Sequence, residues 1–144
     1  MARPRSSPSG TLALPSPKRK FTLAEANRTL PLVSRIVRDV VKVHGQVSHL
    51  QASLQAGVRG RRAEQMEAEL ETRLHRLHEL IEELTQIGCE LKDCSMGLID
   101  YVGRHQGRDI LLCWKLGEDS IRYWHELHAG FAGRQPVSIL EEDR

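Results

Sequence analysis

The sequence predicts a mainly α-helical α+β protein, with a long antiparallel helical hairpin, a small antiparallel β-meander and a short C-terminal helix. Apolar residues recur at helical spacing through two long stretches before Gly88. Gly57 and Gly60 mark a turn between these stretches, so the two helices are expected to run antiparallel. After Gly88 the spacing changes to alternation and short apolar runs, which are typical of strands.

A capping box marks the start of the first helix. The Thr22 hydroxyl is placed to accept from a backbone N–H of the first turn, and the Glu25 side chain is placed to reach back to the Thr22 N–H. Pro31 has no N–H to donate, and its ring clashes with the preceding helical turn. We therefore expect a short helix over 22–29, a kink, and a long helix from Pro31 to about residue 56.

Both long helices carry an apolar seam with spacings of three and four residues. The first seam comprises Leu23, Ala26, Leu30, Val33, Val37, Val40, His44 and Val47, and the second comprises Ala63, Met66, Leu70, Arg73, Leu77, Leu80, Leu84 and Ile87. Gly88 follows the second helix, predicted over 62–87, where a left-handed C-terminal cap belongs. Two helices alone cannot enclose these seams. We expect the C-terminal module and a second copy of the chain to cover them, in a homodimer with coiled-coil packing.

The segment after the hairpin predicts two or three strands and a last helix. Residues 89–92 alternate between apolar and polar side chains. Two strand-like runs and the hairpin loop between them are residues 98–102, 103–107 and 109–114. The sequence Gly-Glu-Asp then opens a helix, which we expect over 118–128 and which Gly130 ends.

Residues 1–20 differ in composition from the rest of the chain. They contain four of the six prolines and five basic residues, Arg3, Arg5, Lys18, Arg19 and Lys20, with no acidic residue. Such a segment is expected to be disordered, and it offers nucleic-acid contact as one functional alternative. The remaining chain carries slightly more acidic than basic residues, which argues against a dedicated nucleic-acid binder. We expect it to form one domain over 21–140, divided into the hairpin (21–88) and a strand-and-helix module (89–140).

The cysteine count and the hydropathy pattern bear on the compartment. The chain has three cysteines, Cys89, Cys94 and Cys113, and the odd number argues against a disulfide framework. No apolar run approaches the ~20 residues that span a bilayer, and Thr11–Pro15 is too short for the core of a signal peptide. These features predict a cytoplasmic protein with no membrane contact.

Four residues in the last third of the chain offer metal ligands. Cys113, Glu118, His125 and His128 combine a thiol, a carboxylate and two imidazoles, which are ligands that zinc and iron accept. The two histidines are three residues apart, so the zinc-protease motif with its spacing of four is absent. A structural network of ion pairs and hydrogen bonds is the first alternative to a metal site, and acid–base catalysis is the second.

A second group of residues suggests a ligand surface. Trp114 and Trp124 suit either an aromatic wall or the core between a sheet and a helix. Arg122 shares the face of the predicted last helix with Glu118, and Arg134 stands between glycines and a proline where it can hold a carboxylate or phosphate. No nucleophile elbow, phosphate loop or dinucleotide fingerprint is present in the sequence, so no enzyme class is predicted. A homodimeric interaction protein that docks on a larger complex is therefore the leading hypothesis.

Several motifs occur together and in order. They are Phe21-Thr22-Leu23-Ala24-Glu25-Ala26-Asn27 with Leu30-Pro31, Gly97-Leu98-Ile99-Asp100-Tyr101, Leu112-Cys113-Trp114 with Gly117-Glu118, Ile121 and Trp124-His125, and Gly130-Phe131-Ala132-Gly133-Arg134-Gln135-Pro136. Together they resemble an uncharacterised bacterial family, the domain of unknown function 2203, over about residues 21–137. The resemblance implies no activity, cofactor or partner.

Overall fold

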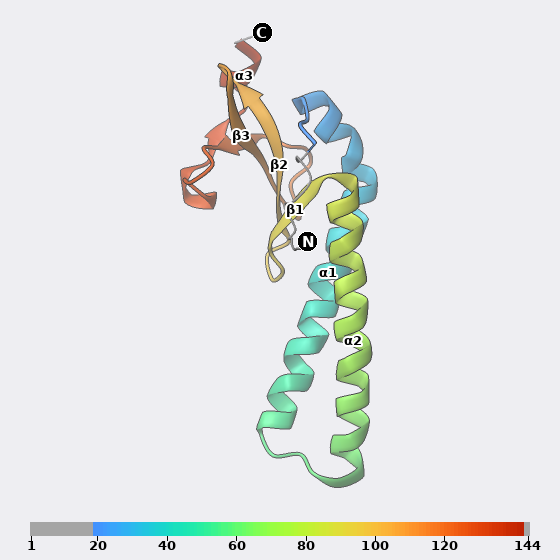
Figure 1. The fold of residues 1–144 in the computed structure, drawn as a ribbon. Helices are drawn as coiled ribbons and strands as arrows, with labels where there is room; N and C mark the ends of the chain where they lie inside the picture. Colours follow the sequence, from blue (N-terminus) through green and yellow to red (C-terminus); the bar gives the residue numbers. More distant parts are fainter. Residues whose placement is uncertain (1–18, 143–144) are drawn as a thin grey trace, which may run out of the picture.

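Two long helices and one antiparallel sheet make up the computed structural model, which describes residues 19–142 (Figure 1). The helices α1 (Leu23–Gln55) and α2 (Gly60–Ile87) form the predicted hairpin. The strands follow one another in the sheet in chain order, as β1 (Cys89–Asp93), β2 (Leu98–His105), β3 (Arg108–Lys115), β4 (Tyr123–His125) and β5 (Gln135–Pro136). A 3-10 turn, η2 (Phe131–Gly133), precedes β5, and the short helix α3 (Ser138–Glu142) follows it. The predicted fold class is confirmed, with more strands than expected.

The start of α1 is as predicted, but its continuity is not. Thr22 and Glu25 form the full capping box, with the Thr22 N–H donating to Glu25 and the Glu25 N–H donating to Thr22. The predicted break at Pro31 is wrong, since α1 is one helix with Pro31 inside it. Leu30 and Val33, on either side of the proline, are both buried in the same core. Their burial keeps the helix continuous through Pro31 despite the hydrogen bond that the proline removes.

The main core lies between the hairpin and one face of the sheet. Side chains that alternate along β2, β3 and β4 are buried there with the α1 seam, and they include Ile99, Tyr101, Ile110, Leu112, Trp114 and Trp124. The Tyr101 hydroxyl lies 2.6 Å from the Thr29 hydroxyl of α1, and the Tyr101 ring meets Phe21 edge to face. The Asn27 side chain accepts a hydrogen bond from the Ile121 N–H. These contacts fix the sheet on the N-terminal half of α1.

The turn between β2 and β3 is tighter than the five-residue loop that we expected. Gln106 and Gly107 are the only residues between the two strands, and both have positive φ angles, 52° and 77°. A two-residue turn of this kind matches the twist of the flanking strands. The register therefore runs without a break from Leu98 opposite Lys115 to His105 opposite Arg108.

The helix predicted over 118–128 is wrong. The chain there forms a loop and then β4, which pairs with β3 through Trp124 opposite Leu112 and His125 opposite Leu111. Each tryptophan also places its indole N–H on a backbone carbonyl, Trp114 on that of Glu118 and Trp124 on that of Pro136. Burial of these two rings against the hairpin outweighs the local helix signal.

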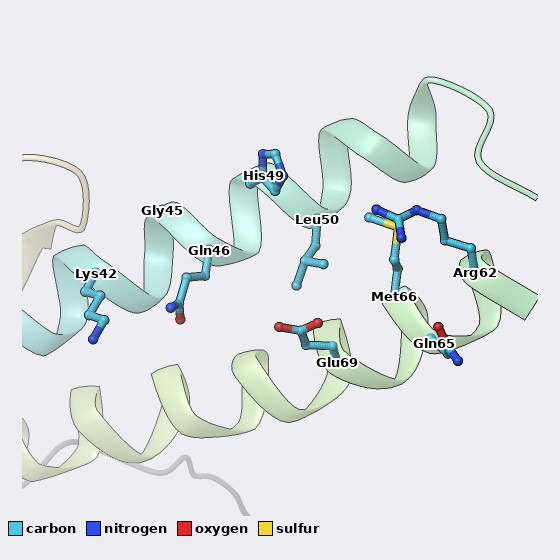
Figure 2. Close-up of a pocket in the computed structure, with 9 residues that line it drawn as sticks. All are labelled: Lys42, Gly45, Gln46, His49, Leu50, Arg62, Gln65, Met66 and Glu69. Atoms are coloured by element: carbon cyan, nitrogen blue, oxygen red, sulfur yellow. The ribbon is translucent and has the colours of Figure 1, made fainter.

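The hairpin extends beyond the sheet as a two-helix arm, which we define as residues 42–55 of α1 and 60–76 of α2 (Figure 1). Within α2 only Leu80 and Leu84 are buried, and both lie outside the arm. A polar cleft of about 540 Å³ opens between the arm's helices, with Lys42, Gln46, Arg62 and Glu69 among the side chains that line it (Figure 2). The apolar core therefore thins toward the tip of the hairpin.

Residues 1–18, which carry most of the basic segment considered for nucleic-acid contact, lie outside the described residues. Two basic residues of the segment, Arg19 and Lys20, are described. Lys20 Nζ lies 3.0 Å from Asp109 Oδ1, and the Arg19 guanidinium lies over the Phe21 ring. Both contacts are made within the protein's own fold. In the described part of the chain, no helix combines the length and apolar character required to cross a membrane.

Two glycine substitutions test how the hairpin joins the sheet. Gly88 caps α2 with a φ of 118°, and a Cβ added there would lie 2.9 Å from the Phe21 ring. We expect Gly88→Ala to lower the free energy of unfolding by about 1–3 kcal/mol, because it adds strain and a clash with a buried ring. Gly45 lies inside α1 with open space around it, so Gly45→Ala should instead raise the free energy of unfolding by up to ~1 kcal/mol. Urea denaturation followed by circular dichroism measures both, and equal effects of the two substitutions would contradict this account.

Candidate metal centre

Three ionisable side chains meet on the sheet face that points away from the hairpin. Asp100 of β2 lies directly opposite Cys113 of β3, and Cys113 lies opposite Tyr123 of β4. His125 is two residues beyond Tyr123, so it projects from the same face as Cys113. The ligand atoms of Asp100, Cys113 and His125 all lie within 4.8 Å of one another. Within residues 19–142 this is the one such group of three or more His, Cys, Asp or Glu residues, and we call it the centre.

The centre is shielded from water. The exposed fractions of Asp100, Cys113 and His125 are 3%, 0% and 3%. Burial raises the pKa of the Asp100 carboxyl, partly offset by the neighbouring His125 and by a hydrogen bond from the Cys113 thiol. Burial, helped by the Asp100 charge, raises the pKa of the Cys113 thiol to about 12. Without a cation the thiol therefore stays protonated at neutral pH, and it is a poor nucleophile.

The orientation of His125 is fixed by its backbone. Its Nδ1 atom lies 2.7 Å from the carbonyl oxygen of Glu126, which can only accept, so Nδ1 carries the proton. In the neutral ring, Nε2 then presents a lone pair to Asp100 Oδ1, 3.3 Å away. A hydrogen bond from one ring nitrogen to a backbone carbonyl is the usual way in which a metal-binding histidine is held.

Residues 126–134 follow His125 of the centre in the chain, and we call this segment the flap. It leaves β4 directly after His125 and lies on the side of the sheet away from the hairpin (Figure 1). At its end, Arg134 donates to the Cys113 carbonyl at 3.4 Å and stacks 4.1 Å from the centroid of the Tyr123 ring. The flap's Phe131 ring faces both Arg134 and Lys115. The end of the flap therefore contacts β3 and β4 beside the centre.

The Glu118 carboxylate pairs with Arg134 beside the centre. Arg134 Nη2 lies 2.8 Å from Glu118 Oε1, and the two side chains are 13% and 22% exposed. The same Glu118 oxygen accepts from the Lys115 N–H at 2.9 Å. The pair therefore joins the flap to the loop that follows β3, with little competition from water.

Comparison with known proteins gives one match. The model of a family described as an uncharacterized conserved protein (DUF2203) matches residues 19–137. The chain belongs to this family. A search of curated proteins and a search of solved structures found no match.

The motifs by which the chain resembles DUF2203 converge on the centre and the flap. Asp100 comes from the Gly97–Tyr101 motif, Cys113, Glu118 and His125 come from the next motif along the chain, and Arg134 comes from the last. The strands bring these motifs together although up to 34 positions separate them in the chain. The DUF2203 match covers all five residues.

The structure brings together two of the four metal ligands suggested by the sequence. Cys113 and His125 are both in the centre, whereas Glu118 is engaged by Arg134, and His128 is exposed in the flap. Asp100 is the residue that the spacing argument missed. Its signal was an acidic side chain inside an apolar strand run, where a charge needs a partner.

The residues considered for a ligand surface lie in different places. Trp114 and Trp124 are buried against the hairpin, on the opposite face of the sheet from the centre. Arg122 is exposed, and its Nη2 atom lies 3.9 Å from Asp119 Oδ2, outside the group that forms the centre. Arg134 alone among these four residues contacts a residue of the centre.

Proposed function

We propose that this protein binds a zinc ion through Asp100, Cys113 and His125. The observation that carries the proposal is the meeting of a thiol, an imidazole and a carboxylate, all buried, within 4.8 Å. Each is a known zinc ligand, and together they supply the mixed sulfur, nitrogen and oxygen set of zinc sites. Non-haem iron more often takes two histidines and a carboxylate, and the centre has one histidine, so zinc is the better match.

The electrostatics of the centre favour a bound cation. The Nε2 lone pair of His125 and the Asp100 carboxylate face each other across 3.3 Å, and two acceptors need a positive charge or a proton between them. A proton satisfies that contact, and the neutral Cys113 thiol then hydrogen-bonds to Asp100. A zinc ion satisfies all three atoms at once and favours the thiolate over the thiol.

Zinc binding to the full chain, freed of metal by a chelator and dialysed, tests the proposal. We expect close to one zinc per chain by elemental analysis, and a sulfur-to-metal charge-transfer band when Co²⁺ replaces zinc. Cys113→Ser should abolish the band and lower zinc affinity at least ~10-fold, because the thiolate is lost. Cys89→Ser is the matched control, since Cys89 is also a buried strand thiol whose pKa burial raises to about 12, outside the centre. An equal loss of zinc affinity in Cys113→Ser and Cys89→Ser, or no stoichiometric metal in the parent chain, would refute zinc binding at the centre.

The pH dependence of zinc affinity gives a second test. Binding must displace the Cys113 proton, because burial holds the pKa of that thiol near 12. Raising the pH therefore strengthens binding, by about tenfold per pH unit for each proton released, and lowering it weakens binding. Zinc titrations across neutral pH, with calorimetry in buffers of different ionisation enthalpy, measure the proton count. Affinity that does not change with pH would be inconsistent with thiolate ligation.

A homodimer built through the two-helix arms is a second candidate function, as part of an interaction or assembly role. None of the other helices and strands that the structure describes packs on the arm in Figure 1, and the arm's Leu74 side chain is 44% exposed. Within the arm, residues 42–55 of α1 carry one basic and no acidic residue, and residues 60–76 of α2 carry four of each, so no net repulsion opposes the contact of two arms. Two arms packed side by side would cover the Leu74 face of each copy.

Light scattering after size-exclusion chromatography tests the homodimer. We expect twice the chain mass for the parent protein and a shift toward the monomer for Leu74→Lys, because a charge would be buried in the proposed interface. Ile139→Lys is the matched control, since Ile139 is 43% exposed in α3, far from the arm (Figure 1). A parent chain that is monomeric at all concentrations, or an equal response of both variants, would exclude the arm as the interface.

A further inference from the structure

We propose that the flap gates an open coordination position at the centre, and that a small anion occupies this position. The inference rests on the proposed zinc site and adds to it a ligand class and a gate. The number of protein ligands, the way the flap is attached and one unpartnered donor on Arg134 support it.

The centre supplies three ligands where zinc takes four. Among residues 19–142, no fourth His, Cys, Asp or Glu joins the group of Asp100, Cys113 and His125. The nearby Glu118 carboxylate is already held by Arg134 and by the Lys115 N–H. Three protein ligands with a fourth position left for an outside molecule is the arrangement of reactive zinc sites, whereas structural sites have four.

The flap is attached weakly compared with the strands beneath it. Its backbone hydrogen bonds run within the segment, from the N–H groups of Ala129, Gly133 and Arg134 to carbonyls of residues 126, 130 and 131. No residue of 126–134 is buried, and Leu127 is 57% exposed. Segments with few buried contacts open at low free-energy cost. The flap contacts the strands beside the centre, so it is the segment that we expect to open for entry.

Side-chain contacts hold the two ends of the flap. At its start, Glu126 forms a two-point ion pair with Arg108, with distances of 2.6 and 3.1 Å. At its end, Arg134 pairs with Glu118 and stacks on Tyr123. The Arg134–Glu118 pair is the less exposed of the two, and we call it the latch.

One donor on the latch has no partner. Arg134 Nε is buried and makes no hydrogen bond within the described part of the chain, although Nη2 of the same guanidinium reaches the Cys113 carbonyl. A buried N–H of a charged group without an acceptor is costly, and an anion would satisfy it. Because the same guanidinium lies at the Cys113 carbonyl, a small anion on the metal would lie near this donor. The geometry thus points to a ligand such as azide, cyanate or a short carboxylate.

Azide binding to the Co²⁺-loaded full chain tests the ligand class. We expect azide to change the visible spectrum of the parent protein with a saturable dependence, and Arg134→Gln to weaken azide at least ~10-fold while the cobalt–sulfur band persists. Arg104→Gln is the matched control, since Arg104 is exposed and donates to the Gly107 carbonyl at the far turn. An unchanged spectrum with saturating azide, or equal weakening by both variants, overturns the inference. Absence of any cobalt–sulfur band in the parent chain would instead refute the proposed zinc site.

Metal release tests the gate. Glu118→Gln removes the charge of the latch but keeps the oxygen that accepts from the Lys115 N–H, so it should speed zinc removal by excess chelator about tenfold. Glu79→Gln, in an exposed ion pair of α2 with Arg76, should leave the rate unchanged. Far-ultraviolet circular dichroism checks that each variant is folded. Equal release rates in Glu118→Gln and the parent chain would show that the latch does not control entry.

Discussion

The antiparallel register of β2, β3 and β4 is the constraint on which both faces of this protein depend. Side chains alternate between the faces of a strand, so one register sends Tyr101, Leu112 and Trp124 toward the hairpin. The same register sends Asp100 and Cys113 to the opposite face. A slip of one residue between β2 and β3 would bury Asp100 among the helices and expose Tyr101. The apolar core therefore holds the register, and the register assembles the centre.

Apolar burial on the hairpin side of the sheet offsets the free energy lost when the ionisable groups of the centre are removed from water. Ionisable groups taken out of water destabilise a fold unless they are paired. The pKa of Asp100 and that of Cys113 are both raised, so burial disfavours the charged form of each group. The two indole rings and the α1 seam bury a large apolar area on the hairpin side. That burial stabilises a sheet whose second face is not optimised for stability, which is typical of a functional site.

The sequence was informative where the structure is periodic and local. The seams of α1 and α2, the capping box at Thr22 and the left-handed Gly88 are all set by residues close in the chain, and each was predicted correctly. The strand β4 was not, because three residues cannot establish a pattern and its stability comes from Leu111 and Leu112 on a neighbouring strand. Local signals after Gly117 favour a helix, and only the long-range burial of Trp124 overrides them.

The residues of the centre could be predicted from the sequence only in part, because long-range strand pairing brings them together. Cys113 and His125 were singled out by residue type, and this choice needed no knowledge of the fold. Glu118 was added because a helix would have placed it on the same face as His125, and the loss of that helix removes the reason. Asp100 lies 13 positions before Cys113 and becomes its neighbour only through the two-residue turn at Gln106 and Gly107. Neither chemistry nor spacing reveals such a pairing until the register is known.

The proposed zinc binding and the proposed dimer formation belong to separate parts of the molecule, because the fold places the centre and the arm far apart. The hairpin meets the sheet along the N-terminal half of α1, through contacts such as Thr29 with Tyr101 and Asn27 with Ile121, and at the end of α2, which contacts β1. The arm beyond these contacts has its own exposed face around Leu74. The centre lies on the far face of the sheet, with the main core between it and the hairpin. Well-separated sites without shared partners act nearly additively, so a change at the arm and a change at the centre should affect stability independently. Coupling between metal binding and assembly would therefore require a change in the core itself, where Tyr101 and Trp114 join the two halves.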